Sequence, residues 1–370
     1  MVNHTIADAR MAAQVLHARL GTDYDKPIDV FRTVQQEGIW LASQPLDAGL
    51  YGFYLRQGDA TGIVLNKNHP EQLQRYTCAH ELGHHVLGHA SHLDDEDDVL
   101  KPTAASKANE TAAQAFAGVF LMPLQAVNRV MHRLGFTKDR RLDASDVYQI
   151  SRELDVSFSA AAWQLAGLRR IHSQDADRWA RQGAAAAKNS MRPGPPPEGD
   201  NRAALYILDS RDREIPILCR PGDELRLRLP EDASTGHVWR IVASSNTPVA
   251  ARLSWDGGET VEREPTPDTH ERSAELLERG ALRLARQNYL TDGAAELQQA
   301  QTAVGRQGIR EFVFVANQPG RTAMDLRLSR PWETNEVADF RTVVRVGPAH
   351  VLDGFAHDQA QAHIARVAGG

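Results

Sequence analysis

The chain has 370 residues, a hydrophobic content of 42% and a formal net charge of −6. This length is enough for two domains with hydrophobic cores. The slightly acidic balance lacks the overall basic character that favours nucleic-acid binding. No stretch approaches the roughly 18 apolar residues that a membrane span requires, and the N-terminus holds no apolar signal-peptide core.

The number of cysteines indicates the redox environment in which the protein works. The chain has two cysteines, Cys78 and Cys219, one in each half. Two distant cysteines argue against a disulfide framework and favour a reducing environment. We therefore expect a soluble cytoplasmic protein that does not bind membranes.

The first half of the chain alternates helical patterns with a few short strands. In chain order, we expect helices over 7–20 and 27–38, strands over 39–44, 50–56 and 62–66, and a helix that begins at Pro70. Further helices are expected over 104–121, 124–134, 144–154 and 158–170. The strand before the Pro70 helix is expected to be an edge strand.

The most informative run is His80-Glu81-Leu82-Gly83-His84, an H-E-x-x-H pattern in the helix that begins at Pro70. Residues four apart lie on one helix face, so His80 and His84 can bind one metal ion together. Glu81 stands beside them, where a carboxylate can polarise a water on the metal. The pattern favours a catalytic zinc site, and a chance pair of structural histidines is the alternative.

A catalytic zinc site needs a third protein ligand and an open position for water. On a continuous helix, His85 points about 100° and His89 about 180° away from the metal-binding face. Both therefore fit surface positions, or positions beside the ligands, better than ligand positions. Glu110 is the better third ligand, because it shares an apolar helix face with Ala113 and Phe116, where a carboxylate needs a partner.

Neighbouring residues are weaker candidates. Cys78 should face away from His80, so we interpret it as a buried structural cysteine. Tyr76, His85 and His132 are weak candidates for the acid that protonates the leaving amine. The helix pair over 147–168 resembles a DNA-reading unit but offers few groups for base edges, so direct nucleic-acid binding is not favoured.

The composition changes after the first 183 residues. Residues 184–202 combine four alanines with a proline- and glycine-rich run and predict a semi-rigid linker. Strands are then expected over 204–209, 214–219, 224–229, 238–243, 249–254, 310–316, 322–329 and 340–346, with a helical insert over 273–304. Short alternating runs between turns predict an antiparallel sandwich over 203–348, followed by a tail over 349–370.

The first half resembles a known family. The H-E-x-x-H run, followed by Glu110-x-x-Ala113-x-x-Phe116-Ala117 and Leu121-Met122-Pro123, is similar to the ImmA/IrrE family of bacterial metallopeptidases. The resemblance covers about residues 7–171. It implies an α+β, zincin-like fold with helices and a small sheet, and Zn²⁺ held by His80, His84 and Glu110, with Glu81 as the general base.

The same resemblance implies how a substrate binds. The strand that ends at Asn66 would receive an extended peptide by β-addition, through Val64, Leu65 and Asn66. The expected substrate is a protein such as a transcriptional repressor or an antitoxin-like regulator. Its limited proteolysis would switch on a stress, mobile-element or phage-defence response.

The second half carries three loops that resemble another family. The loops are 230–239, 305–308 and 330–333, and in order they are similar to chagasin-type inhibitors of papain-like cysteine peptidases. The resemblance implies an Ig-like sandwich that presents partner-binding loops. The match is carried by Thr235-Gly236, Trp239 and Arg330-Pro331-Trp332-Glu333. The resemblance implies that partner binding involves Thr235, Gly236, Trp239, Gly305, Gly308, Arg330, Pro331 and Trp332.

Three interpretations of the whole chain stay open. The first is a zinc endopeptidase whose sandwich selects the substrate or restrains the peptidase until a signal arrives. The second is a protein-binding or inhibitor module whose metal site is structural or inactive. The third is autoinhibition, with a sandwich loop or the proline-rich segment in the cleft. The sequence does not indicate the oligomeric state.

Overall fold

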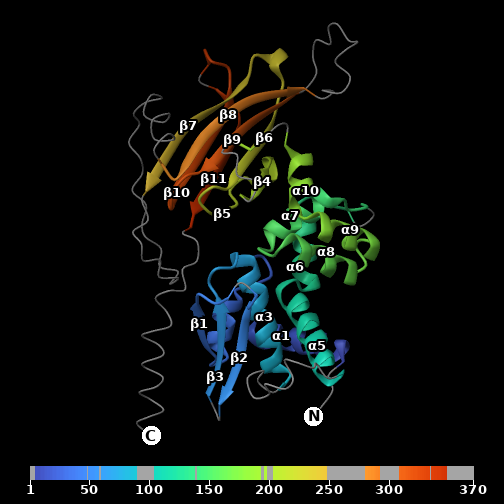
Figure 1. Cartoon of the computed structure of the whole chain (residues 1–370). Helices are drawn as coiled ribbons and strands as arrows, with labels where there is room; N and C mark the ends of the chain where they lie inside the picture. The colour runs from blue at the N-terminus through green and yellow to red at the C-terminus, as the bar shows by residue number, and fades with distance from the viewer. Residues whose placement is uncertain are drawn as a thin grey trace. The chain divides into compact units, whose positions relative to one another are not determined.

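The computed structural model describes residues 5–47, 49–57, 60–89, 104–137, 140–192, 196–197, 203–247, 280–291, 308–333 and 335–347. The chain divides into two compact units, one up to Met191 and one from Arg192 (Figure 1). Among the described residues, no helix has the length and apolar character to cross a membrane.

The first unit combines helices with a three-stranded sheet (Figure 1). Its elements are α1 (Ile6–Leu20), α2 (Val30–Gln36), β1 (Trp40–Gln44), β2 (Gly52–Gln57), β3 (Ala60–Asn66), α3 (Glu71–Val86), α5 (Ala104–Leu121), α6 (Leu124–Arg133), α7 (Ala144–Glu153), α8 (Phe158–Gly167), α9 (Ser173–Gln182) and α10 (Ala184–Met191). The helices and strands expected over 7–170 are present, although α2 begins at Val30, after the cap residue Asp29, and not at residue 27. Capping residues mark several helix starts, and Ser157 accepts the backbone N–H of Ala160 at 3.2 Å as α8 begins.

The strand order in this sheet is β1-β3-β2, with β3 parallel to β1 and antiparallel to β2. The expectation that β3 is an edge strand is wrong, because its backbone pairs on both sides. Val64, Leu65 and Asn66 are buried in the pairing and cannot receive a peptide by β-addition. Within the described part of the sheet, the edges are β1 and β2.

Asn66 has a structural role at the end of β3. Its Nδ2 donates to the carbonyl oxygens of Leu46, Asp47 and Leu50 at 3.2, 3.0 and 2.8 Å. Its Oδ1 accepts the backbone N–H groups of Leu46 and Asn68 at 3.2 and 3.1 Å. One buried side chain therefore satisfies the backbone of the loop between β1 and β2.

Helix α3 packs against β2 and β3 on one side and against α5 on the other (Figure 1). Gly83 lies at the contact with α5. A Cβ at this position would lie 3.1 Å from the Phe116 ring and 3.3 Å from the backbone of Ala113. The glycine within the H-E-x-x-H run thus permits the close approach of the two helices.

Helix α1 supports α5 from another side. The His17 ring stacks on Phe120 with 4.7 Å between ring centroids, and its Nε2 lies 2.9 Å from the Phe120 carbonyl oxygen. Burial lowers the pKa of His17, so this packing favours the neutral ring.

The start of the expected linker is helical. Residues 184–191 form α10, which packs against α7 and α9, with Ala187 buried and the Ser190 hydroxyl 2.9 Å from that of Ser145. The four alanines favour a helix, because alanine has the highest helix propensity. The proline- and glycine-rich run that follows led the whole segment to be predicted as a linker. Residues 193–195 and 198–202 of the expected linker lie outside the described residues.

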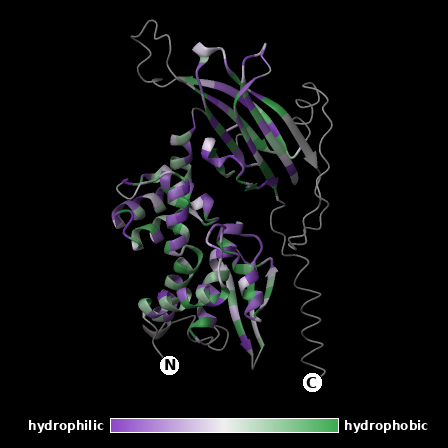
Figure 2. Ribbon diagram, turned by 180° about the vertical axis from the view of Figure 1, so that it is seen from behind, coloured by the Kyte–Doolittle hydropathy of each residue, from purple (hydrophilic) through white to green (hydrophobic). Residues whose placement is uncertain are grey.

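The second unit is an Ig-like sandwich of two four-stranded sheets, β5-β11-β10-β7 and β4-β6-β9-β8. Its strands are β4 (Leu205–Leu208), β5 (Ile217–Cys219), β6 (Glu224–Glu231), β7 (Val238–Thr247), β8 (Leu282–Thr291), β9 (Gly308–Ala316), β10 (Gly320–Ser329) and β11 (Glu336–Val346). Hydrophobic and hydrophilic residues alternate along these strands (Figure 2). The inward residues form one core that includes Leu225, Leu227, Phe312, Phe314 and Leu326.

Two expectations for this unit need correction. The sandwich is not wholly antiparallel, because β4 pairs parallel to β6 and β5 pairs parallel to β11. Residues 282–291 of the expected helical insert form strand β8, which pairs with β9. Pairing with β9 outweighs the local helical pattern here. The rest of the insert and the strand expected over 249–254 lie outside the described residues.

We expect Asn66→Ala to lower the free energy of unfolding by about 2 kcal/mol, because it removes the hydrogen bonds by which the buried Asn66 side chain holds the backbone of the loop between β1 and β2. Urea unfolding of the full chain measures the change. Asn68→Ala is the matched control, since the Asn68 side chain is exposed and its hydrogen bond to the Leu46 carbonyl oxygen is long, at 3.5 Å. Equal stability of the two variants would show that Asn66 does not hold the loop.

Candidate metal centre

Helix α3 positions two imidazoles one turn apart. The Nε2 atoms of His80 and His84 lie 3.2 Å from each other, and the rings meet edge to face with centroids 4.8 Å apart. The His84 side chain is fully buried, whereas that of His80 is 16% exposed. The Nε2 atoms of both rings therefore point at one position, as the four-residue spacing of the two histidines predicts.

Glu110 of α5 completes the group. Its Oε2 lies 3.1 Å from His80 Nε2, and its Oε1 lies 3.3 Å from His84 Nε2. Zinc bonds of about 2.0–2.2 Å in tetrahedral geometry would place neighbouring ligand atoms about 3.3–3.6 Å apart. The three side chains thus fit a zinc ion, and two imidazoles with one carboxylate are a suitable donor set.

The donor set leaves room for catalysis. Three protein ligands leave one position of a tetrahedral site open. The Glu110 side chain is 37% exposed, so the centre is accessible to solvent from the α5 side. Glu81 follows His80 on α3 and is 6% exposed. A buried carboxylate next to the donors can serve as a general base.

Cys78 does not belong to the donor group formed by His80, His84 and Glu110. Its side chain is fully buried, and burial raises the pKa of the thiol. A protonated, buried thiol is neither a ready metal ligand nor a nucleophile. These observations agree with a structural cysteine.

His89 lies where a continuous helix would not put it. Helix α3 ends at Val86, and Gly88 adopts a left-handed conformation with φ of 66°. The chain then turns back, and His89 Nδ1 lies 3.1 Å from His84 Nδ1. The direction expected for His89 assumed an uninterrupted helix and is wrong, whereas the expected position beside the ligands agrees with this contact. Gly88 was the sequence signal for the helix end.

His85 is directed toward the sheet rather than toward the donor group. Its Nδ1 lies 3.1 Å from the hydroxyl of Tyr54, a buried residue of β2. Burial lowers the pKa of His85 and raises that of Tyr54. This contact fastens β2 to the helix that carries the two donor histidines.

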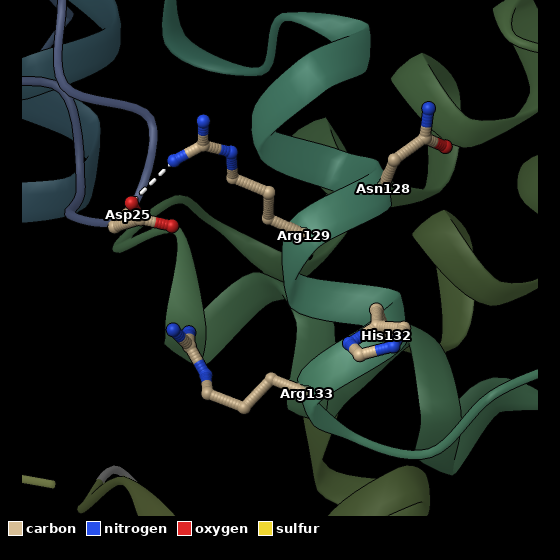
Figure 3. A pocket seen from close by; sticks show the side chains of 5 residues that line it. All are labelled: Asp25, Asn128, Arg129, His132 and Arg133. Carbon is tan, nitrogen blue, oxygen red and sulfur yellow. Dashed lines mark hydrogen bonds and ion pairs between the residues drawn. The ribbon is translucent and has the colours of Figure 1, made fainter.

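His132 lies in a separate hollow of about 370 Å³. The hollow is also lined by Asp25, Asn128, Arg129 and Arg133, and Arg129 forms an ion pair with Asp25 (Figure 3). None of the three metal donors lines this hollow. The location does not support His132 as an acid at the metal centre. Tyr76 is largely buried, which raises the pKa of its hydroxyl.

In the sandwich, two of the three expected loops lie together. Arg330 Nε donates to the carbonyl oxygen of Thr235 at 2.9 Å. A Cβ on Gly236, whose φ is 75°, would lie 3.5 Å from the Trp332 ring. Trp332 itself is 74% exposed, and Pro331 is exposed beside it. The loops over 232–237 and 330–333 therefore form one surface with an exposed indole.

Two residues expected on that surface belong to the framework instead. Trp239 is 5% exposed, and its Nε1 donates to the carbonyl oxygen of Pro230 at 2.8 Å. Gly308 is buried at the start of β9, where a Cβ would lie 2.4 Å from the ring of Tyr289. Both positions are explained by packing. Gly305 lies outside the described residues.

Each half of the chain matches the model of a known protein family. Residues 34–165 match the Peptidase_M78 model, described as the IrrE N-terminal-like domain. Residues 219–346 match the model of the chagasin family of peptidase inhibitors, I42. No curated protein matches the chain. The chain combines an IrrE-like domain, which indicates a metallopeptidase, with a chagasin-like domain, as the sequence motifs predict.

Similarity to solved structures is distant. The cysteine protease inhibitor EhICP2 from Entamoeba histolytica is 18% identical over 39% of this chain and 96% of its own, with a TM-score of 0.25. PbICP-C, solved in complex with falcipain-2, is 12% identical over 39% of this chain and 91% of its own, with a TM-score of 0.21. A Mycobacterium tuberculosis transcriptional regulator is 19% identical over 44% of this chain and 48% of its own, with a TM-score of 0.31. At these scores the similarities carry no argument about function.

We expect the purified wild-type chain to contain about one zinc ion and Glu110→Ala to lose it, because a tetrahedral catalytic site requires three protein ligands. Elemental analysis after dialysis against dilute zinc measures both. Glu153→Ala is the matched control, since Glu153 pairs with Arg133 away from the donor group. Retention of zinc by Glu110→Ala would contradict the ligand set.

Proposed function

We propose that this chain is a zinc-dependent endopeptidase that cuts a regulatory protein at a limited number of sites. The observation that carries the proposal is the convergence of His80 Nε2, His84 Nε2 and a carboxylate oxygen of Glu110 within 4.8 Å of one another. The match of residues 34–165 to the IrrE-like family supports it.

Each side chain has a role in this proposal. His80, His84 and Glu110 hold the metal and leave one position for water and substrate. When bound, zinc polarises both the attacking water and the scissile carbonyl. Glu81 accepts the proton of the water at its carboxylate.

The substrate would bind at the edge of the sheet. Strand β2 is an edge among the described strands and packs against α3. An extended peptide can pair with the backbone of such an edge. We therefore propose β2, in place of β3, as the strand that aligns the peptide beside the metal centre.

The identity of the substrate rests on family resemblance. A transcriptional repressor or an antitoxin-like regulator is the proposed class, with a role in a stress, mobile-element or phage-defence response. The sandwich would recognise the substrate or control the peptidase. The cytoplasmic location expected from cysteine usage stays a prediction.

We expect Glu81→Gln to keep zinc and to lower the cleavage rate by at least about 100-fold, because the amide cannot accept a proton from water. Cleavage of a fluorogenic peptide library and zinc content are measured on the same samples, with Glu153→Gln as the matched control. Cleavage by Glu81→Gln at the wild-type rate would rule out Glu81 as the base.

A second candidate function is capture of a papain-like cysteine peptidase by the sandwich. The favouring observation is the exposed Trp332 beside Gly236, on loops that Arg330 holds together. Exposed aromatic side chains on a fixed loop surface are typical anchors of protein interfaces. The match of residues 219–346 to the chagasin family supports this candidate.

For this candidate, we expect the full chain to inhibit papain and Trp332→Ala to weaken inhibition at least about tenfold, through loss of the aromatic anchor. Inhibition constants from a chromogenic papain assay measure the effect. Val337→Ala, an exposed position of the same unit outside the loops, should inhibit like the wild type. Absence of inhibition by the wild-type chain would exclude papain-like peptidases of this type as partners.

A further inference from the structure

The far side of the His84 ring faces another histidine. His84 Nδ1 lies 3.1 Å from His89 Nδ1, and the two rings meet edge to face with centroids 5.0 Å apart. His84 is fully buried and His89 is 5% exposed. A hydrogen bond between two buried imidazoles requires that one nitrogen carries the proton and that the other accepts it.

The metal centre determines which nitrogen is the donor. His84 Nε2 points at His80 Nε2 and Glu110, so this nitrogen must be unprotonated to bind a metal. The proton of the neutral His84 ring then resides on Nδ1 and is donated to His89 Nδ1. His89 must in turn carry its own proton on Nε2.

We propose that His89 is a positioning residue that fixes the tautomer and orientation of His84 for metal binding. The inference rests on the metal centre proposed above and adds a residue to it. Groups that accept a hydrogen bond from a metal-bound histidine increase both its basicity and its alignment. His89 does so from outside the donor group.

The end of α3 explains how His89 reaches this place. The N–H of Gly88 bonds to the carbonyl of His85 at 3.0 Å, and the N–H of His89 bonds to the carbonyl of His84 at 2.9 Å. This pair of bonds around a left-handed glycine is a Schellman motif. The motif reverses the direction of the chain at the end of α3, so that His89 lies beside His84.

Two substitutions of His89 separate a hydrogen-bond role from packing. His89→Leu removes the acceptor, whereas His89→Gln keeps an oxygen that can accept the Nδ1 proton of His84. His132→Leu is the matched control, because His132 is exposed in the hollow that none of the three metal donors lines. Circular dichroism of the metal-free proteins checks that each variant is folded.

Zinc affinity of the full chain, measured by competition with a chromophoric chelator, is the readout. We expect His89→Leu to bind zinc about 10- to 100-fold more weakly than the wild type, His89→Gln to recover much of the loss, and His132→Leu to match the wild type. Equal affinity of His89→Leu and the wild type would overturn this inference alone. A wild-type chain that binds no zinc would overturn the proposed function as well.

A second measurement does not depend on any variant being stable. Nitrogen NMR of the zinc-loaded wild-type chain, with ¹⁵N in its histidine rings, reports which ring nitrogen carries each proton. The proposal requires a protonated Nδ1 on His84 and an unprotonated Nδ1 on His89. A proton on His89 Nδ1 would exclude it as the acceptor, even if His89→Leu fails to fold.

Discussion

The close contact between α3 and α5 is the constraint on which the metal centre depends. It is possible because residue 83 is glycine, where a Cβ would lie 3.1 Å from Phe116. Glu110 precedes Ala113 on the face of α5 that meets α3, and the short helix separation lets its carboxylate reach both donor imidazoles. The packing of two helices thus converts a local sequence pattern into a three-dimensional donor set.

The centre also contains polar groups that would be costly to bury alone. His84, His89 and Glu81 are all at most 6% exposed. Such groups are tolerated where hydrogen bonds or a metal compensate for lost hydration. The arrangement of His89, His84 and Glu110 in one chain of contacts is therefore both a stability requirement and a means of orienting the donors.

Local sequence patterns predict the helices and the donor residues of this protein. They do not predict features that depend on pairing between distant segments. The periodicity that places His80 and His84 on one face is a property of a single helix, and the apolar face around Glu110 indicates a buried partner. The central position of β3 depends on which strands meet, and no local pattern determines that order. The helical spacing turned His89 away from the donors because the helix was continued past Gly88, although a place beside the ligands was one of the two positions that the sequence left open. Strand β8 was missed because its pairing with β9 outweighs its helical pattern.

X-ray absorption spectroscopy at the zinc edge of the purified chain tests the central claim most directly. The account predicts nitrogen and oxygen ligands at about 2.0–2.2 Å, with the outer-shell scattering of two imidazoles and no sulfur near 2.3 Å. A sulfur ligand, or scattering from three or more imidazoles, would contradict a centre made of His80, His84 and Glu110.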